Sequence, residues 1–340
     1  MTHGLKEGVY PGAVLVYGRP LAGVSECLCI GTRGITRDVY PVHDNLIYDL
    51  ASLTKILATT FLIMIEVTRG RLRLDRKLGE LGWSGPVAKK SLAAVLAHQS
   101  GLAPWRPFYS LRPEPSMREA YRRALTEEPL EPGLRRTVYS DLNFMILGFV
   151  LEELNQCSLE ELFRTEIAGP LCLPNTGFNL KEGTLAPTED GPRIGGPLDY
   201  KGAKIMGPVP LGRVHDDNAA FLGGAGGQAG LFGTAPEIWR LLSHWAGVLN
   251  GQAGLVSKEV LTAFISPQKA RKGPVRALGF DLGTGFWTGT VGHVGYTGGC
   301  VFWDPLKDEA VVFLCNRVHP TARNRKILDF RPKMATVLRS

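Results

Sequence analysis

The two ends of the chain show apolar and polar residues in strand-like alternation, and the middle shows helical spacing. Strands are predicted at residues 13–17 and 25–31, and again at 276–282, 292–295, 300–303 and 310–314. The Asp304-Pro305 pair separates the last two strands, as expected for a hairpin connection. Amphipathic or apolar helices are predicted at residues 91–97, 119–126, 142–154, 237–248 and 327–338.

This order of elements predicts an α/β architecture in one domain spanning residues 1–340. Residues 1–60 and 230–340 would form an α/β lobe, and residues 61–229 a mostly helical inserted lobe. Residues 181–212 are rich in Gly and Pro and lack periodicity, so a long irregular loop is expected. Together with residues 105–109, this loop is expected to wall a cleft.

Composition and targeting signals indicate an ordinary globular protein. The 340 residues are 44% hydrophobic and 21% charged, which allows a large core. No secretion signal is recognised in the first eleven residues, and the longest apolar run, residues 56–67, is short for a bilayer span. We therefore expect a cytoplasmic protein without membrane contact. Its six cysteines contain no C-x-x-C pair, and Cys27 and Cys29 are expected to be reduced core residues.

The net charge of +7 comes from basic residues that are spread along the chain. Without aromatic residues interleaved on one basic face, a solvated surface is favoured over a nucleic-acid groove. A mild attraction for anionic substrates is compatible with this charge. The seven histidines show no H-E-x-x-H spacing, so neither a metal site nor another cofactor is expected.

Ser52 and Lys55 stand three residues apart at the head of the apolar run. Positions i and i+3 share a helix face, so the hydroxyl and the amine can meet. A lysine in a dry pocket has a lowered pKa and can remove the serine proton, which the weak serine nucleophile requires. The simpler alternative is a polar first turn with a solvated lysine, because S-x-x-K alone is common.

Two further segments carry candidate chemistry. Tyr139 precedes Ser140 and Asp141 at a predicted helix start, where it could exchange protons beside a lysine, while Ser140 or Asp141 caps the helix. The glycine-rich segment 293–299 could lay its backbone against a substrate, or form a plain hairpin with a core histidine. Glycines at 223–233 loosely resemble a dinucleotide loop, but no strand-like run precedes them, so a packed structural loop is favoured.

The order of these segments resembles the serine β-lactamases and penicillin-binding proteins, most closely their class C-like branch. That branch carries S-x-x-K, Y-x-N and K-T-G in sequence; residues 52–55, 139–141 and 293–295 occupy those places here. Shorter matches lie at residues 96–102, 214–216, 230–232 and 316–317. The resemblance implies the β-lactamase/transpeptidase-like fold, in which helices flank an antiparallel sheet.

The resemblance also implies roles for individual residues. Ser52 would be acylated, Lys55 and Tyr139 would share the base and acid roles, and His293 would replace the family lysine. The backbone N–H groups of Ser52 and Tyr296 would form the oxyanion hole. The residues expected to contact substrate are Asp141, Asn143, Gly295 and Thr297. Water activated near Tyr139 would then hydrolyse the acyl-enzyme.

Two positions depart from the family pattern. Asp141 replaces the motif asparagine by a carboxylate, and His293 replaces a permanent cation by a group with a usual pKa near ~6.5. At pH 8 a neutral His293 would hold a substrate carboxylate poorly, and acidification to about pH 5.5 would charge it. We therefore expect a carboxylesterase acting on small or medium acyl esters. The alternatives are a β-lactamase or D-amino-acid peptidase, and a non-catalytic binding module of the same fold.

Overall fold

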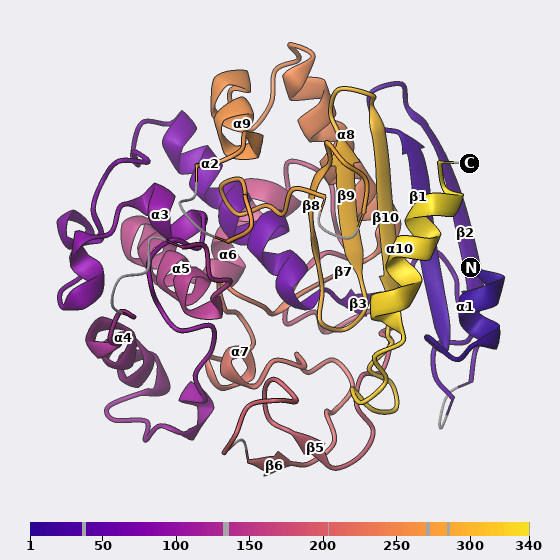
Figure 1. Cartoon of the computed structure of the whole chain (residues 1–340), viewed down its shortest axis with the longest axis horizontal. Helices are drawn as coiled ribbons and strands as arrows, with labels where there is room; N and C mark the ends of the chain where they lie inside the picture. The colour runs from indigo at the N-terminus through magenta and orange to yellow at the C-terminus, as the bar shows by residue number, and fades with distance from the viewer. Residues whose placement is uncertain (36–38, 132–135, 203, 270–272, 284–285, 340) are drawn as a thin grey trace.

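A five-stranded antiparallel sheet unites the two ends of the chain in the computed structural model, which describes residues 1–35, 39–131, 136–202, 204–269, 273–283 and 286–339. The strands follow the order β2-β1-β10-β9-β8. Their bounds are β1 Gly12–Arg19, β2 Val24–Gly31, β8 Val291–Val294, β9 Cys300–Asp304 and β10 Glu309–Cys315. The first strand pairs with the last, Ala13 opposite Cys315, so both termini lie beside one sheet (Figure 1).

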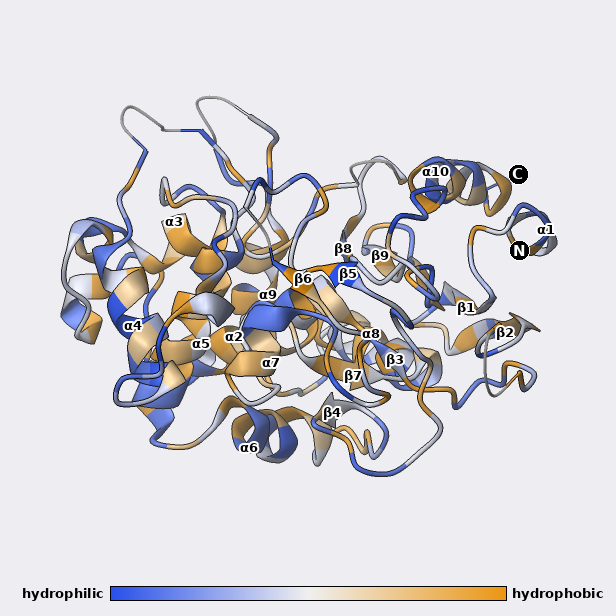
Figure 2. Cartoon of the chain, turned by 90° about the horizontal axis from the view of Figure 1, so that it is seen from below, coloured by the Kyte–Doolittle hydropathy of each residue, from blue (hydrophilic) through white to orange (hydrophobic). Residues whose placement is uncertain are grey.

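Alternation along β1 sends side chains to the two faces of the sheet. Val14 and Val16 join the main core, which includes the helix α8 (Ala235–Leu249). Ala13 and Leu15 join a smaller core against α10 (Ile327–Val337). Figures 1 and 2 show these two helices on opposite faces of the sheet, with α1 (Thr2–Lys6) on the same side as α10.

Helices are the main regular structure between β2 and β8, and the predicted helices are confirmed within a few residues. Further helices are α3 Leu92–Leu96, α4 Met117–Glu127, α5 Asp141–Asn155, α6 Leu159–Phe163, α7 Asp217–Phe221 and α9 Lys258–Ile265. Shorter helical turns cover Leu78–Leu81, Pro86–Lys89, Phe108–Ser110 and Arg164–Ala168. A small sheet has the order β3 (Tyr48–Asp49), β7 (Leu231–Gly233), β4 (Gly177–Phe178). The predicted irregular loop contains one short pair, β5 (Arg193–Ile194) with β6 (Ile205–Met206).

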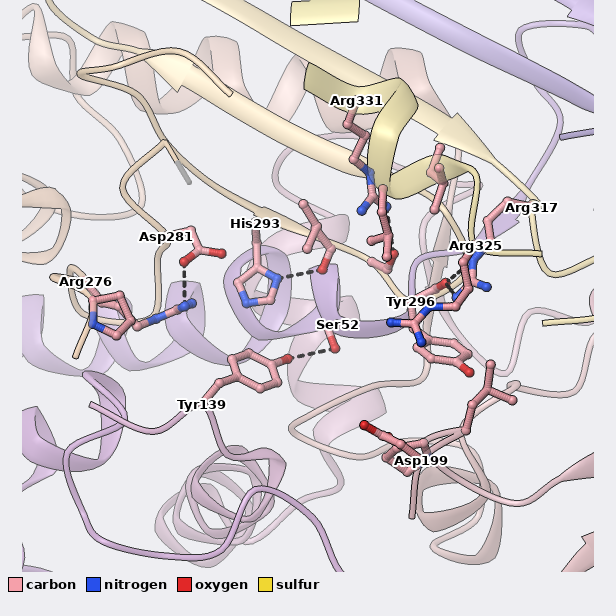
Figure 3. A pocket seen from close by; sticks show the side chains of 17 residues that line it. Ser52, Tyr139, Asp199, Arg276, Asp281, His293, Tyr296, Arg317, Arg325 and Arg331 are labelled. Carbon is pink, nitrogen blue, oxygen red and sulfur yellow. Dashed lines mark hydrogen bonds and ion pairs between the residues drawn. The ribbon is translucent and has the colours of Figure 1, made fainter. Parts of the chain in front are cut away.

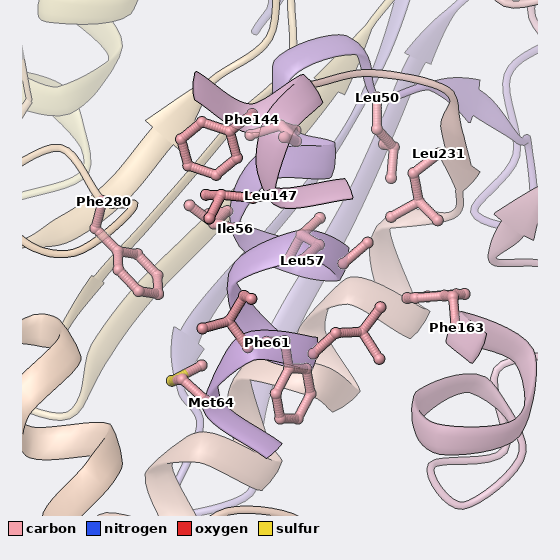
Figure 4. Close-up of a cluster of buried hydrophobic side chains, with 14 of the residues drawn as sticks. Leu50, Ile56, Leu57, Phe61, Met64, Phe144, Leu147, Phe163, Leu231 and Phe280 are labelled. Atoms are coloured by element: carbon pink, nitrogen blue, oxygen red, sulfur yellow. The ribbon is translucent and has the colours of Figure 1, made fainter. Parts of the chain in front are cut away.

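The serine segment crosses the middle of the core. A 3-10 turn at Ala51–Leu53 leads into a π-helix at Lys55–Thr60 and then α2 at Phe61–Thr68. Residues Ala51–Thr68 are long and apolar enough to cross a membrane, with a mean hydropathy of 1.5, yet 83% of the stretch is buried in the protein. Figure 2 shows α2 among the other helices, and Figure 4 shows hydrophobic side chains of this segment within the core, as in the core helix of a globular fold.

The strand predicted at residues 276–282 is wrong. The chain turns back at Gly279, whose φ of +88° is accessible to glycine, and the Ala277 N–H donates to the Phe280 carbonyl. Only isolated bridges remain, including one between Arg276 and Asp281. The reversal therefore places the side chains of Arg276 and Asp281 side by side.

The cysteines are free thiols, as the spacing predicted. The predicted core position of Cys27 and Cys29 is wrong, because both are exposed. They lie on β2, the edge strand of the sheet, which is exposed along most of its length.

Phe61→Ala should destabilise the protein by about 3–5 kcal/mol, the usual cost of removing a fully buried phenyl ring. Figure 4 shows Phe61 within the core, where it is 0% exposed. Its ring packs edge-on against that of Trp245 at a centroid distance of 5.3 Å. Chemical denaturation measures the change, with Leu306→Ala as the control, because Leu306 is 94% exposed. Equal midpoints for the two variants would contradict this packing.

Candidate active site

A buried aspartate shapes the turn that presents Ser52. The Asp49 carboxylate accepts hydrogen bonds from the Ala51 N–H at 2.8 Å and from the His215 N–H at 2.7 Å. Ala51 has a φ of +46°, a strained conformation for a residue with a Cβ. The hydrogen bonds of Asp49 hold this strained turn, and the half-buried Ser52 follows it directly.

Three predicted residues meet at the Ser52 hydroxyl. The Tyr139 hydroxyl lies 2.9 Å from Ser52 Oγ, and Lys55 Nζ lies 3.1 Å from the same atom. Lys55 comes from the next turn of the serine segment, as the i, i+3 spacing predicted. Tyr139 precedes α5, which packs against the π-helix that begins at Lys55. The arrangement places two groups able to exchange protons on one nucleophile.

Lys55 is charged in this environment, contrary to the expectation of a lowered pKa. Its side chain is fully buried, and burial alone would lower the pKa. The Asp141 carboxylate at 2.7 Å and the Tyr139 oxygen outweigh burial, so the pKa of Lys55 is raised above its usual value. The Gln228 carbonyl accepts a further hydrogen bond from Nζ at 2.9 Å.

His98 positions the segment that carries Tyr139, a role that sequence reasoning missed. The Ser140 N–H donates to His98 Nδ1 at 3.0 Å, and the rings of His98 and Tyr139 are 4.8 Å apart. Burial and the nearby Arg276 and Lys55 charges lower the pKa of His98 well below its usual value. The neutral ring can therefore accept this bond. Ser140 stands at the N-cap position of α5, but its hydroxyl donates to the Ala103 carbonyl instead of capping.

His293 lies on β8, close to Tyr139, with a ring-centroid distance of 5.7 Å. Its Nδ1 is 2.8 Å from the Val294 carbonyl, and its Nε2 is buried without a partner. Burial, then the charges of Arg276 and Lys55, hold the pKa of His293 well below its usual value. This lowered pKa opposes the expectation that mild acidification charges His293, because burial and the neighbouring cations favour the neutral imidazole.

Two arginines hold the backbone after β8 in place. The Tyr296 carbonyl accepts hydrogen bonds from Arg317 at 2.6 and 2.9 Å, and the Gly295 carbonyl accepts one from Arg331 at 3.0 Å. The Tyr296 N–H makes no hydrogen bond within the described residues, and Tyr296 lines both cavities that contain Ser52. This is compatible with the predicted oxyanion hole.

Two of the predicted substrate contacts are buried away from these cavities. Thr297 is 1% exposed, and its hydroxyl donates to the Asp49 carbonyl at 2.7 Å. Asn143 is 0% exposed, with its amide 3.5 Å from His98 Nδ1. Both tie neighbouring segments together. Gly295 lines the larger cavity and Asp141 lines the smaller one.

The larger cavity, about 500 Å³, extends from Ser52 toward a buried guanidinium (Figure 3). Arg276 lines this cavity and pairs with Asp281 through Nη1 at 2.5 Å, while its Nε and Nη2 are buried without partners. The guanidinium also lies 5.5 Å from the centre of the Tyr139 ring. A second cavity of about 200 Å³ is lined by Ser52, Asp141 and Trp105.

The glycine-rich segment 223–233 is a packed structural loop, as favoured above. A Cβ on Gly227 would lie 2.0 Å from the Phe144 carbonyl of α5, so the loop and the helix touch backbone to backbone. The described residues include no group of three His, Cys, Asp or Glu side chains that could hold a metal ion.

Comparison with known proteins agrees with this geometry. The family profile described as Beta-lactamase matches residues 11–331. A protein of Escherichia coli O157:H7 with the provisional name D-alanyl-D-alanine carboxypeptidase is 30% identical over 314 residues, covering 82% of this chain and 71% of that protein.

Solved structures share the fold at low sequence identity. The Beta-Lactamase/D-Alanine Carboxypeptidase from Pseudomonas syringae has a TM-score of 0.74 at 16% identity, covering 98% of this chain and 96% of that one. EstCE1, described as a hydrolase with promiscuous acyltransferase activity, has a TM-score of 0.71 at 19% identity, covering 97% and 96%. The chain has the β-lactamase/transpeptidase-like fold, and with the match over residues 11–331 it belongs to the β-lactamase family of serine hydrolases.

Proposed function

We propose that the protein cleaves amides or esters through an acyl-Ser52 intermediate, and that the leaving group carries a carboxylate, as in a D-amino-acid carboxypeptidase. The observation that carries this proposal is Arg276, which lines the cavity, is 5% exposed, and has its buried Nε and Nη2 without partners. Two parallel N–H groups of a guanidinium match a carboxylate. Arg276 could thus supply the positive charge that the neutral His293 lacks. Its guanidinium lies further from Ser52 than His293 does (Figure 3).

The names of relatives support the same choice. The relative from Escherichia coli has the provisional name D-alanyl-D-alanine carboxypeptidase, and that name describes the relative. In this chain Arg276 Cζ and Lys55 Nζ lie 5.5 and 5.2 Å from the centre of the Tyr139 ring. A carboxylate on Arg276 would therefore bring the adjacent scissile bond toward Tyr139 and Ser52.

A carboxylesterase without charge selection remains the second candidate. Its support is the neutral His293 at the K-T-G lysine position and the apolar wall formed by Pro197, Leu198, Ile327 and Leu328. Such a wall would accept an uncharged acyl chain or alcohol.

Arg276→Gln should reduce kcat/KM for a peptide ending in D-alanine by about tenfold to a hundredfold, and leave its C-terminal methyl ester nearly unaffected. A hydrogen bond to a charged group is worth about 1.5–3 kcal/mol, which corresponds to that range. Steady-state hydrolysis of the two matched substrates, followed by mass spectrometry, measures the change.

Two variants complete this experiment. Arg276→Lys should retain part of the preference, and Arg276→Gln with Asp281→Asn removes the carboxylate that would otherwise lose its partner. If the wild type prefers the methyl ester and Arg276→Gln changes neither rate, the carboxypeptidase hypothesis is wrong and the carboxylesterase hypothesis replaces it.

A further inference from the structure

As an ammonium, Lys55 has no lone pair for the Ser52 proton. Three groups surround Nζ: Ser52 Oγ and the Gln228 carbonyl accept hydrogen bonds from it, and Asp141 Oδ1 forms an ion pair with it at 2.7 Å. The carbonyl and the carboxylate can only accept. Of the three partners, only the carboxylate can take a proton from the ammonium and so convert Lys55 into a base.

The other groups around Ser52 are poor bases at neutral pH. Burial raises the pKa of Tyr139, and the Asp141 charge adds to that rise, although Lys55 opposes it. Tyr139 is 36% exposed as a residue, and its hydroxyl donates a hydrogen bond to Ser52 Oγ. His293 has its pKa held far below the usual value. Asp141 is thus the carboxylate in direct contact with the Ser52–Lys55 pair.

Building on the acyl-serine function proposed above, we propose that Ser52, Lys55 and Asp141 form a proton relay, in which Asp141 stores the proton that Lys55 must release. A proton first passes from Lys55 Nζ to Asp141 Oδ1 across the 2.7 Å contact. The neutral amine then takes the Ser52 proton as Oγ bonds to the substrate carbonyl carbon. The re-formed ammonium gives a proton to the leaving group as the scissile bond breaks, and Asp141 returns the stored proton to Nζ.

Burial favours this internal transfer over release of the proton to solvent. The Lys55 side chain is 0% exposed and that of Asp141 is 19% exposed. Moving the proton between them neutralises a cation and an anion together, so no net charge is created in the dry site. The asparagine found at this position in the Y-x-N motif could accept a hydrogen bond from Nζ but could not store its proton.

In any pH measurement, the titration of neighbouring groups must be distinguished from an effect of Asp141. The groups around the relay are Tyr139, Asp216, His98, His293 and Arg276. Burial and then the Asp141 charge raise the pKa of Asp216 to about 6. Asp216 caps α7 and accepts from the Gln228 side chain, and it has no ion pair with Lys55. Asp216→Asn is therefore the charge-matched comparison.

The test is the pH dependence of acylation in Asp141→Asn, measured with a p-nitrophenyl ester between pH 6 and 9. The p-nitrophenolate leaves without needing a proton, so the rate reports removal of the Ser52 proton. The relay predicts a wild-type rate that is nearly flat above pH 7. In Asp141→Asn the proton must leave to solvent, so the rate should rise about tenfold per pH unit below the pKa of Lys55, which loss of the Asp141 charge lowers.

Conservative variants separate proton storage from a structural role. Asp141→Glu should restore the flat profile, and Asp216→Asn should keep it above pH 7. Thermal melts confirm that each variant is folded, and intact mass confirms that Ser52 is acylated. If wild type and Asp141→Asn show superimposable profiles while Ser52 is acylated, the relay is wrong and the acyl-serine function stands. If wild-type Ser52 is never acylated, the proposed function itself fails.

Discussion

Ser52→Ala is expected to reduce hydrolysis by about 10⁴-fold or more, because removal of the nucleophile of a serine hydrolase leaves only binding and oxyanion contacts. Ser52 Oγ is the atom that both Lys55 Nζ and the Tyr139 hydroxyl contact, at 3.1 and 2.9 Å. The strained turn at Ala51 presents this hydroxyl to both Ser52 cavities. Steady-state hydrolysis of an ester, with intact-mass detection of the acyl adduct, measures the loss.

The same variant should remain folded, because the Ser52 side chain is half-buried and its hydrogen bonds are confined to Lys55 and Tyr139 among the described residues. A melting temperature close to that of the wild type is the control. Detection of the acyl group on another residue, or near wild-type turnover in Ser52→Ala, would remove Ser52 from the proposed mechanism.

The strands and long helices could be predicted because their residues obey one local period. Val14 and Val16 alternate with Ala13 and Leu15, and the two pairs face different cores. The failure at residues 276–282 has a local origin, since Gly279 reverses a run that otherwise has strand composition. The serine segment was predicted as a simple helix, whereas tertiary contacts to the 227–228 backbone accompany a π-helix there.

The candidate site was predictable where family spacing fixes it and unpredictable where distant segments meet. The Ser52, Lys55 and Tyr139 positions followed from ordered motifs. Asp49 contacts His215, and Arg276 contacts Tyr139, in each case across a long stretch of the chain. No local sequence pattern predicts such contacts. The lowered basicity of His293 likewise arises from burial and charges that the fold supplies.

Lys55→Ala and Tyr139→Phe should each lower kcat by at least about a hundredfold, and the double variant should lose far less than the product of the two. Both groups act on one Ser52 proton, so removing the second has little left to disrupt. Lys55→Ala also removes the ion-pair partner of Asp141 and leaves that carboxylate unpaired.

A fourth variant corrects for that unpaired charge. Lys55→Ala combined with Asp141→Asn removes the ion pair as a unit and serves as the reference for stability in the cycle. The measurement is kcat for one ester across the four members of the Lys55 and Tyr139 cycle, with melting temperatures recorded for each. Losses that multiply, so that their activation free energies add, would mean that the two residues act on separate steps. Sub-multiplicative losses with folded variants would place Lys55 and Tyr139 in one proton-transfer unit around Ser52.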